Sequence, residues 1–512
     1  MRLIPTRLLH AVPPAAGSRE IVPAAGVAAA GVVSALLATG RIPQGSSAAF
    51  ALAVGSVLVG VVATGVAAYR RAARSPRLLG ISPFAIAAAT WLVLFVVRPV
   101  ELYFAPDHSA ISLGELGFAV SDLTRSVAIA GVGIAAWGAG YLVGFGTLPP
   151  RAAETTRGAR PNPLSTRGSS VALAIGTLLW VPLFLRQGGV GALIHSPASI
   201  RNDQTSSFYA FVGLWMINGV GLYALARILR TPTRQAKRVL VASAVLAVAA
   251  AACLQVRGAL GFTVLAGVAI YLEARRPTRR QLAFGIATAV AAGGLLLMMA
   301  QFRAYSTTAS TRDALTLLAK TPPSAYVVSD LSTFDNFVAV QELVPGSIDY
   351  LHGESFEWIP ELLVPRSLWP AKPLGLDFLI SAYVYPGVFV GTPISLQGEL
   401  YWNGGVWVVA VGALVVGLLM GLLGRWGLGH ARGRVGFILY AVMLIYTHAY
   451  LTRSLGTMTS GLVLALIGIS IAVAAASRWS PRAAAASARS RIRWPRGRQD
   501  RRPGATVRGT VR

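Results

Sequence analysis

The chain has 512 residues, of which 54% are hydrophobic and 13% are charged, and its formal net charge is +27 at pH 7. Apolar runs of about 18 residues recur along it, and each is long enough to cross a bilayer core as an α-helix. This composition excludes a soluble multidomain protein. The basic residues lie in short loops between apolar runs, which is typical of membrane topology and not of a nucleic-acid-binding surface.

Residues 1–20 are predicted to be a cytoplasmic N-terminus, and the first span follows over 21–40. That run is longer than the hydrophobic region of about 7–15 residues in a cleaved signal peptide, so we expect it to be retained. The single cysteine, Cys253, lies inside an apolar run and supplies neither an internal disulfide nor a cysteine-based metal site. Because the six histidines are also spread out, the sequence predicts no metal and no other cofactor.

The fold class predicted from these runs is an all-α polytopic membrane protein with about twelve transmembrane helices and one large extracytoplasmic loop. The expected spans are 21–40, 48–69, 81–97, 125–147, 170–185, 208–226, 239–255, 259–273, 281–300, 405–424, 435–452 and 457–476. The first nine fall within residues 21–300 and the last three within 405–476, with the loop over 301–404 between them. The basic segment 477–512 is predicted to be a disordered cytoplasmic tail that contacts anionic lipid headgroups.

Basic and acidic loops alternate between these spans. The basic loops contain Arg70, Arg71, Arg74 and Arg77; Arg151, Arg157, Arg160 and Arg167; Arg227, Arg230, Arg234, Lys237 and Arg238; Arg275, Arg276, Arg279 and Arg280; and Arg425, Arg432 and Arg434. The loops between them contain Glu101, Asp107, Glu115, Asp122 and Asp203, and then the segment 301–404. Because basic loops stay in the cytoplasm, both termini are expected there, and the long loop is expected outside the cytoplasmic (inner) membrane.

Residues 239–273 are almost unbroken apolar sequence, which is too long for a single pass at a rise of about 1.5 Å per residue. Two passes joined by a tight turn preserve the charge alternation and place Arg257 at the outer end of a helix hairpin. A charged residue near membrane depth is costly and is often functional. The alternative is that Arg257 only extends its side chain to the headgroups.

The segment 301–404 is too long for an ordinary connection. Short helices are expected around 312–320 and 331–343, and the rest is punctuated by Pro and Gly. Its arginines and lysine suit phosphate, its aromatic faces suit sugar rings, and its carboxylates and histidine suit general acid–base chemistry. A lipid-linked phosphorylated sugar fits this mixture, and a stiff connector that only anchors in the interface fits it equally.

Three motifs carry a resemblance to a known family. V-P-R-S-L-W-P-A-K-P at 364–373 resembles the P-R-x-x-W/F-P-x-K-P element of the O-antigen polymerase (Wzy-type) family, the oligosaccharide repeat-unit polymerases. G-E-L-Y-W-N-G-G at 398–405 resembles the start of that family's following span, and V-R-G-A-L at 256–260 resembles its R-G step between two helices. The resemblance covers mainly residues 250–460 and the overall topology.

The resemblance implies a GT-C-like, metal-independent glycosyltransferase at the outer face of the cytoplasmic membrane. Such a polymerase transfers a growing glycan from undecaprenyl pyrophosphate onto a lipid-linked repeat unit. The implied partners are the undecaprenyl pyrophosphate-linked oligosaccharide and membrane lipids, with a chain-length regulator and a flippase as further candidates and no nucleic acid. Fixed cations would stabilise the charge that develops on the pyrophosphate.

Two groups of site residues follow from that chemistry. The expected catalytic residues are Arg257, Arg366, His352, Glu354 and His448. The expected substrate-binding residues are Arg303, Lys372, Asp335, Trp369, Glu399, Tyr401, Asn403 and Arg453. The sequence leaves open which of His352, Glu354, Asp335, Glu399 and His448 is the general base, and His448 also fits an ordinary interfacial hydrogen-bonding role.

Three other functions fit the same features. A glycosyltransferase that uses a polyprenyl monophosphate sugar usually has an acidic pair in its first outer loop, and residues 41–47 contain no acid. An O-antigen ligase-like enzyme would share the fold and the arginines. A flippase or transporter usually binds its substrate near the bilayer midplane with broken helices and repeats, and Asn218 is the main polar exception within the spans.

Overall fold

The structure is a computed structural model. It describes residues 18–72, 76–106, 119–146, 164–186, 188–191, 207–254, 257–275, 311–320, 323–365, 368–369, 371–372, 375–385, 391–431 and 436–478, together with isolated positions between 278 and 302. All regular secondary structure in these ranges is helical, so the all-α prediction is confirmed for them. The predicted tail 477–512 lies outside the described residues beyond Arg478.

Nine of the described helices are long and apolar enough to cross a membrane. They are Ile21–Ala38, Ser47–Arg71, Pro83–Phe104, Val120–Phe145, Thr166–Arg186, Phe208–Arg230, Arg234–Cys253, Leu396–Gly429 and Leu455–Ser477. The shorter apolar helices Gly258–Ala274 and Gly436–Thr452 coincide with two more predicted spans. The predicted span 281–300 lies almost wholly outside the described residues. The architecture is that of a multi-pass membrane protein, and the count of twelve spans stays a prediction.

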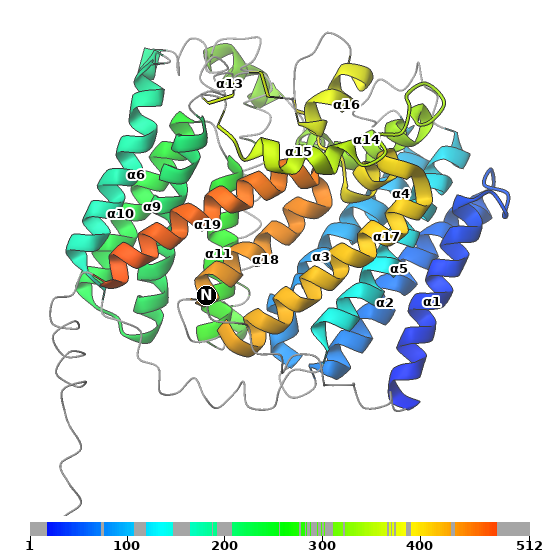
Figure 1. Cartoon of the computed structure of the whole chain (residues 1–512), viewed down its shortest axis with the longest axis horizontal. Coiled ribbons are helices and arrows are strands. Elements are labelled where there is room, and N and C mark those ends of the chain that lie inside the picture. Colours follow the sequence, from blue (N-terminus) through cyan, green and yellow to red (C-terminus); the bar gives the residue numbers. More distant parts are fainter. Residues whose placement is uncertain are drawn as a thin grey trace, which may run out of the picture.

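Two groups of helices flank a central one (Figure 1). The first group contains α1 (Ser18–Ala38), α2 (Ser47–Arg71), α5 (Val120–Phe145) and α17 (Leu396–Trp426), with α5 in contact with the other three. The second contains α6 (Thr166–Arg186), α9 (Ser207–Arg230), α10 (Arg234–Cys253) and α19 (Leu455–Arg478), with α9 in contact with the other three. Between them lie α3 (Pro83–Leu92), α11 (Arg257–Ala274) and α18 (Gly436–Thr452).

Small residues bring α5 and α17 unusually close. A Cβ atom added at Gly140 would lie 2.1 Å from the carbonyl oxygen of Leu414, and one at Gly417 would lie 2.1 Å from that of Trp137. Membrane helices use small residues in this way because lipid supplies no hydrophobic force between them, so backbone packing must hold them together. The pair therefore forms a rigid support for the outer segment that precedes α17.

Four further helices lie across one end of the bundle, at the top of Figure 1. They are α13 (Thr311–Lys320), α14 (Pro323–Leu343), α15 (Glu354–Leu362) and α16 (Leu376–Val384). The helices predicted around 312–320 and 331–343 are confirmed by α13 and α14. The hydroxyl of Ser126, near the start of α5, donates to Gln341 of α14 at 2.6 Å, so α14 lies at the N-terminal end of α5.

Basic residues gather at the opposite end of the helices. Arg71, at the end of α2, donates to the carbonyl of Leu142 near the C-terminus of α5. Arg275, just after α11, donates to the carbonyl of Leu229 at 2.9 Å. Arg230 pairs with Glu273 at 3.6 Å. These described basic helix ends therefore lie at the end of the bundle opposite to α14.

Two helices depart from regular geometry near the outer segment. A π-helical turn at Val93–Val97 joins α3 to α4 (Arg98–Phe104), and such turns occur often at functional sites. Helix α17 begins at Leu396, and its backbone leaves helical geometry at Gly404 and Gly405, where Gly405 has φ 70. This kink falls at the boundary predicted between the loop 301–404 and the span that follows it.

Candidate functional site

A cavity of about 550 Å³ lies where α3, α11 and α18 meet α14, and it is called the central cavity below. Its lining residues are Ala89, Thr90, Val93, Leu94, Gly258, Gly261, Phe262, Leu265, Leu331, Thr333, Pro393, His448, Ala449, Thr452 and Arg453. Most of these side chains are apolar. The polar ones are three threonines, one histidine and one arginine, so the cavity combines an apolar wall with a small set of hydrogen-bonding groups, as ligand sites usually do.

The N-terminus of α11 lies at this cavity. Gly258, the second residue of α11, lines it, and Arg257 is the first residue of the helix. The first backbone N–H groups of a helix have no partner within the helix, and the helix dipole adds partial positive charge there. A helix start is therefore suited to a phosphate group when a second cation is close. The Arg257 side chain lies outside what the structure describes.

His448 and Thr90 face each other from two walls of the cavity. Nδ1 of His448, on α18, lies 2.9 Å from Oγ1 of Thr90, on α3. The same threonine hydroxyl donates to the carbonyl oxygen of Ile86 at 2.9 Å. The imidazole is thus held by a side chain that is itself fixed to the backbone of its own helix.

Arg453 supplies a cation at the same cavity, directly after α18. It lies beside Asp377 of α16, which is 3% exposed and hydrogen-bonded to Ser454. Burial raises the pKa of the Asp377 carboxyl, and the positive charge of Arg453 opposes that rise. Arg453 is therefore within electrostatic reach of a buried carboxyl on α16 while it lines the cavity.

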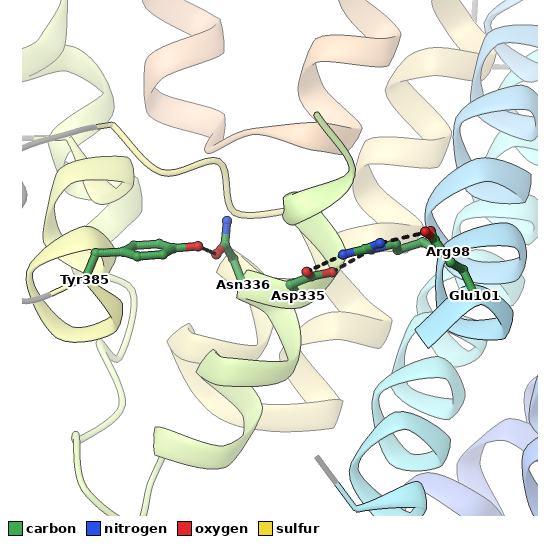
Figure 2. A network of polar contacts seen from close by, with 5 residues as sticks. All are labelled: Arg98, Glu101, Asp335, Asn336 and Tyr385. Carbon is green, nitrogen blue, oxygen red and sulfur yellow. Dashed lines mark hydrogen bonds and ion pairs between the residues drawn. The ribbon is translucent and has the colours of Figure 1, made fainter. Parts of the chain in front are cut away.

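A buried polar network stands behind one wall of the cavity (Figure 2). The Arg98 guanidinium, 0% exposed, donates to both oxygens of Asp335 at 2.9 and 2.6 Å and to Glu101 at 2.9 Å. The next residue, Asn336, donates to the carbonyl of Pro393 at 2.8 Å and accepts from the Tyr385 hydroxyl at 3.1 Å. The network therefore joins α4, α14 and the outer segment.

The residues of this network are close in sequence to residues that line the cavity. Arg98 follows the lining residue Leu94 by one turn, and Asp335 follows the lining residue Thr333 by two positions. Pro393, which accepts the hydrogen bond from Asn336, lines the cavity itself. The ion pair thus fixes α4 against α14, and the hydrogen bond from Asn336 adds the segment of Pro393. Asp335 acts through the wall and does not itself line the cavity.

The motif at 398–405 forms a second cluster, called the Glu399 scaffold. Glu399 is 0% exposed and accepts from the Ser355 hydroxyl at 2.9 Å and from the Leu455 backbone N–H at 2.6 Å. Asn403 donates to Ser355 at 2.8 Å and accepts from the Gly353 backbone N–H at 3.0 Å. These bonds attach the start of α17 to the start of α15 and to α19.

Tyr401 belongs to the same stretch and is also buried. It is 2% exposed, and its hydroxyl is 3.5 Å from the carbonyl of Val344 and 3.4 Å from a guanidinium nitrogen of Arg125. The neighbouring Trp402 donates its indole N–H to the carbonyl of Asp349 at 3.2 Å. These contacts hold the outer segment onto α17, and the predicted substrate-binding role of the motif stays a prediction.

The remaining predicted site residues lie apart from the cavity or outside the described residues. Lys372 donates to the carbonyls of Leu362 and Val364 at 3.3 and 2.9 Å, at the end of α15. His352 and Glu354 are exposed at the start of α15, and Trp369 is 37% exposed. Arg303 and Arg366 lie outside the described residues, so their predicted roles stay predictions.

The central cavity therefore collects two predicted residues, His448 and Arg453, next to the helix start that carries Arg257. Sequence reasoning missed Thr90 and Arg98. Arg98 could have been identified from the sequence, because it directly follows the predicted span 81–97 and an arginine at that depth needs an acidic partner. A threonine within an apolar helix gives no such signal.

In the described part of the chain, no group of three or more His, Cys, Asp or Glu side chains is placed to hold a metal ion. Comparisons with protein-family models, with curated proteins and with solved structures found no match to this chain.

Proposed function

We propose that the chain is a polysaccharide polymerase that transfers a growing glycan from undecaprenyl pyrophosphate onto a lipid-linked repeat unit. The observation that carries the proposal is the meeting of Arg453, His448 and the N-terminus of α11 in one largely apolar cavity. The resemblance of three motifs to the oligosaccharide repeat-unit polymerases supports the same reaction. The central cavity is then the place where the pyrophosphate leaves.

The chemistry of the transfer matches the residues at the cavity. A pyrophosphate leaving group gains negative charge as its bond to the sugar breaks, and fixed positive groups lower the barrier most when they need no rearrangement. Arg453 and the N–H groups at the start of α11 supply such charge. Val93, Phe262 and Leu265 supply apolar surface for the first isoprene units of the lipid.

The proposal includes an orientation. Both termini and the basic helix ends lie in the cytoplasm, and α13 to α16 lie on the outer side of the cytoplasmic membrane, in a GT-C-like arrangement with twelve spans. The placement of basic residues at the end of the bundle away from α14 supports this orientation, because basic loops resist translocation. The central cavity then lies near the outer membrane interface, where lipid-linked oligosaccharides are presented.

Reconstitution tests the proposal. The purified chain in lipid vesicles is supplied with a lipid-linked repeat unit, with and without EDTA, and the product is separated as a glycan ladder. We expect a ladder that survives EDTA and is lost in Arg453→Ala. Arg41→Ala is the matched control, since Arg41 is exposed in the α1–α2 loop and does not line the cavity, and it should retain the ladder.

Two other outcomes would contradict the polymerase proposal and favour a different function. Movement of the lipid-linked unit across the vesicle membrane without any ladder would replace the polymerase with a flippase. Transfer of a single glycan block to a different acceptor, with no ladder, would replace it with a ligase-like enzyme that uses the same leaving group.

A further inference from the structure

We propose that His448 is the general base of this transfer, acting through Nε2, and that Thr90 is the residue that positions it. The inference rests on the proposed function and deepens it by assigning the proton transfer. It is carried by the hydrogen bonds around one imidazole ring.

The hydrogen bonds of Thr90 favour the tautomer of His448 that carries its proton on Nδ1. A threonine hydroxyl has one hydrogen, and Thr90 donates it to the carbonyl of Ile86 at 2.9 Å. Its oxygen therefore accepts in the 2.9 Å contact with His448, which makes Nδ1 the donor. In the neutral imidazole the lone pair then lies on Nε2, because only one ring nitrogen is protonated.

The other titratable candidates for the general base do not line the cavity. Asp335 is fully buried and accepts two hydrogen bonds from Arg98. Glu399 is fully buried and accepts from Ser355 and the Leu455 backbone. His352 and Glu354 are exposed at the start of α15 and do not line the cavity. Among the described residues that line it, His448 is the group able to accept a proton, and Arg453 is the charged one beside it.

Nε2 of His448 takes the proton of the acceptor hydroxyl while that oxygen forms a bond to the anomeric carbon of the donor glycan. The bond between that carbon and the pyrophosphate oxygen breaks, and the pyrophosphate leaves with the bonding electron pair. Arg453 and the start of α11 meet the added negative charge. The imidazolium then releases its proton to solvent, which restores the neutral ring.

The tautomer is tested without any substrate. Full-length protein containing ¹⁵N-histidine is placed in lipid nanodiscs, and the ring ¹⁵N shifts identify the protonated nitrogen of each of the six histidines. The signal missing from His448→Gln belongs to His448. We expect the Nδ1–H form in the wild type and in Thr90→Ser, and a mixture of both tautomers in Thr90→Val. An Nε2–H form or an imidazolium in the wild type at the assay pH overturns the inference.

Kinetics test the role of the pair. Removal of a general base costs on the order of 10²–10⁴-fold in rate, and we expect a loss in that range in kcat for His448→Gln. Thr90→Val should lower kcat by about 10-fold with an unchanged acceptor KM, because it alters the base and not ground-state binding. Thr90→Ser should recover the wild-type rate.

A matched control separates this role from helix packing. Thr263 on α11 makes the same kind of bond to the carbonyl four residues earlier, at 2.7 Å, and does not line the cavity. Thr263→Val should leave kcat unchanged. Full activity in His448→Gln would overturn the inference and leave the polymerase standing. A wild type without transferase activity would refute the proposed function, while the tautomer measurement would still judge the Thr90–His448 contact.

Discussion

The central cavity and the Glu399 scaffold contain similar residue types and differ in how those residues are used. Glu399 and Asn403 are buried, and both make several hydrogen bonds that join α17 to other segments. His448 and Arg453 instead line an open volume of about 550 Å³. Burial thus separates the polar residues that hold the segments around the cavity together from those that face its interior.

The largest expected effect concerns the ion pair behind the cavity wall. Arg98→Ala leaves the Asp335 carboxylate buried without its guanidinium partner, and breaking a buried pair from one side costs about 3–5 kcal/mol. We expect a large fall in the apparent thermal midpoint in detergent. The double variant Arg98→Met with Asp335→Leu removes both charges and should recover much of that loss. A single variant as stable as the double would show that the pair does not hold α14 against α4.

The next prediction tests whether filling the cavity lowers the transfer rate without lowering stability. Gly258 lines the cavity, and a Cβ atom added there meets nothing within 4 Å, so a larger side chain fills open volume without a clash. Gly258→Leu should reduce the transfer rate by about 10-fold or more, which corresponds to about 1.4 kcal/mol of transition-state stabilisation, and leave the thermal midpoint unchanged.

Gly55→Leu is the control for that variant. Gly55 lies on α2 away from the cavity, and a Cβ atom there also meets nothing within 4 Å. It should leave both rate and stability unchanged. Equal rate losses in the two variants would mean that activity responds to added bulk anywhere on the helices, and the central cavity would lose its assignment.

A third prediction concerns the Glu399 scaffold. Glu399→Gln keeps the shape of the side chain and replaces one acceptor oxygen with a donor, so its remaining oxygen can accept from the Leu455 N–H while the hydrogen of the Ser355 hydroxyl loses its acceptor. A buried group left without its partner costs about 1–3 kcal/mol. We expect a lower thermal midpoint with kcat close to that of the wild type at low temperature. A kcat loss as large as that of His448→Gln, with unchanged stability, would move Glu399 into the catalytic site.

The sequence predicted the helices well and the site only in part, for physical reasons. A span is a local property of length and hydropathy, so the runs that became α1, α2 and α5 are visible without any partner. The role of Glu399 depends on Ser355 and Leu455, which lie on other segments and meet it only after folding. A carboxylate in a motif looks the same whether it faces a sugar or a backbone N–H.

Thr90 is a second residue whose role cannot be predicted from the local sequence. Within an apolar helix a threonine usually bonds to its own backbone, as Thr90 does with Ile86, so nothing in the local sequence marks it. Its second contact is with His448, more than three hundred positions away in the chain. Only the packing of α3 against α18 reveals that contact.

The smallest expected effect is a pH dependence of stability that arises at Glu342, at the C-terminal end of α14. Glu342 lies outside the membrane spans, and burial together with the neighbouring Asp122 carboxylate raises its pKa from 4.5 to about 7. The folded state thus holds this proton more tightly than the unfolded state does. The stabilisation is fully present below pH 4.5 and is lost as the pH rises through about 7.

Because Glu342 is only partly buried, solvent screening reduces this contribution to the free energy of unfolding to about 1–2 kcal/mol. We expect the wild-type thermal midpoint to be lower at pH 8 than at pH 5, and this difference to shrink in Glu342→Gln, which keeps the neutral form at both pH values. Asp313→Asn is the control, since Asp313 is exposed on α13 and should leave the difference intact. A pH difference of the same size in Glu342→Gln would assign it to other groups. Loss of the difference in that variant alone would show that this end of α14, about two turns along the helix from Asp335, is held by a protonated carboxyl and not by an ion pair.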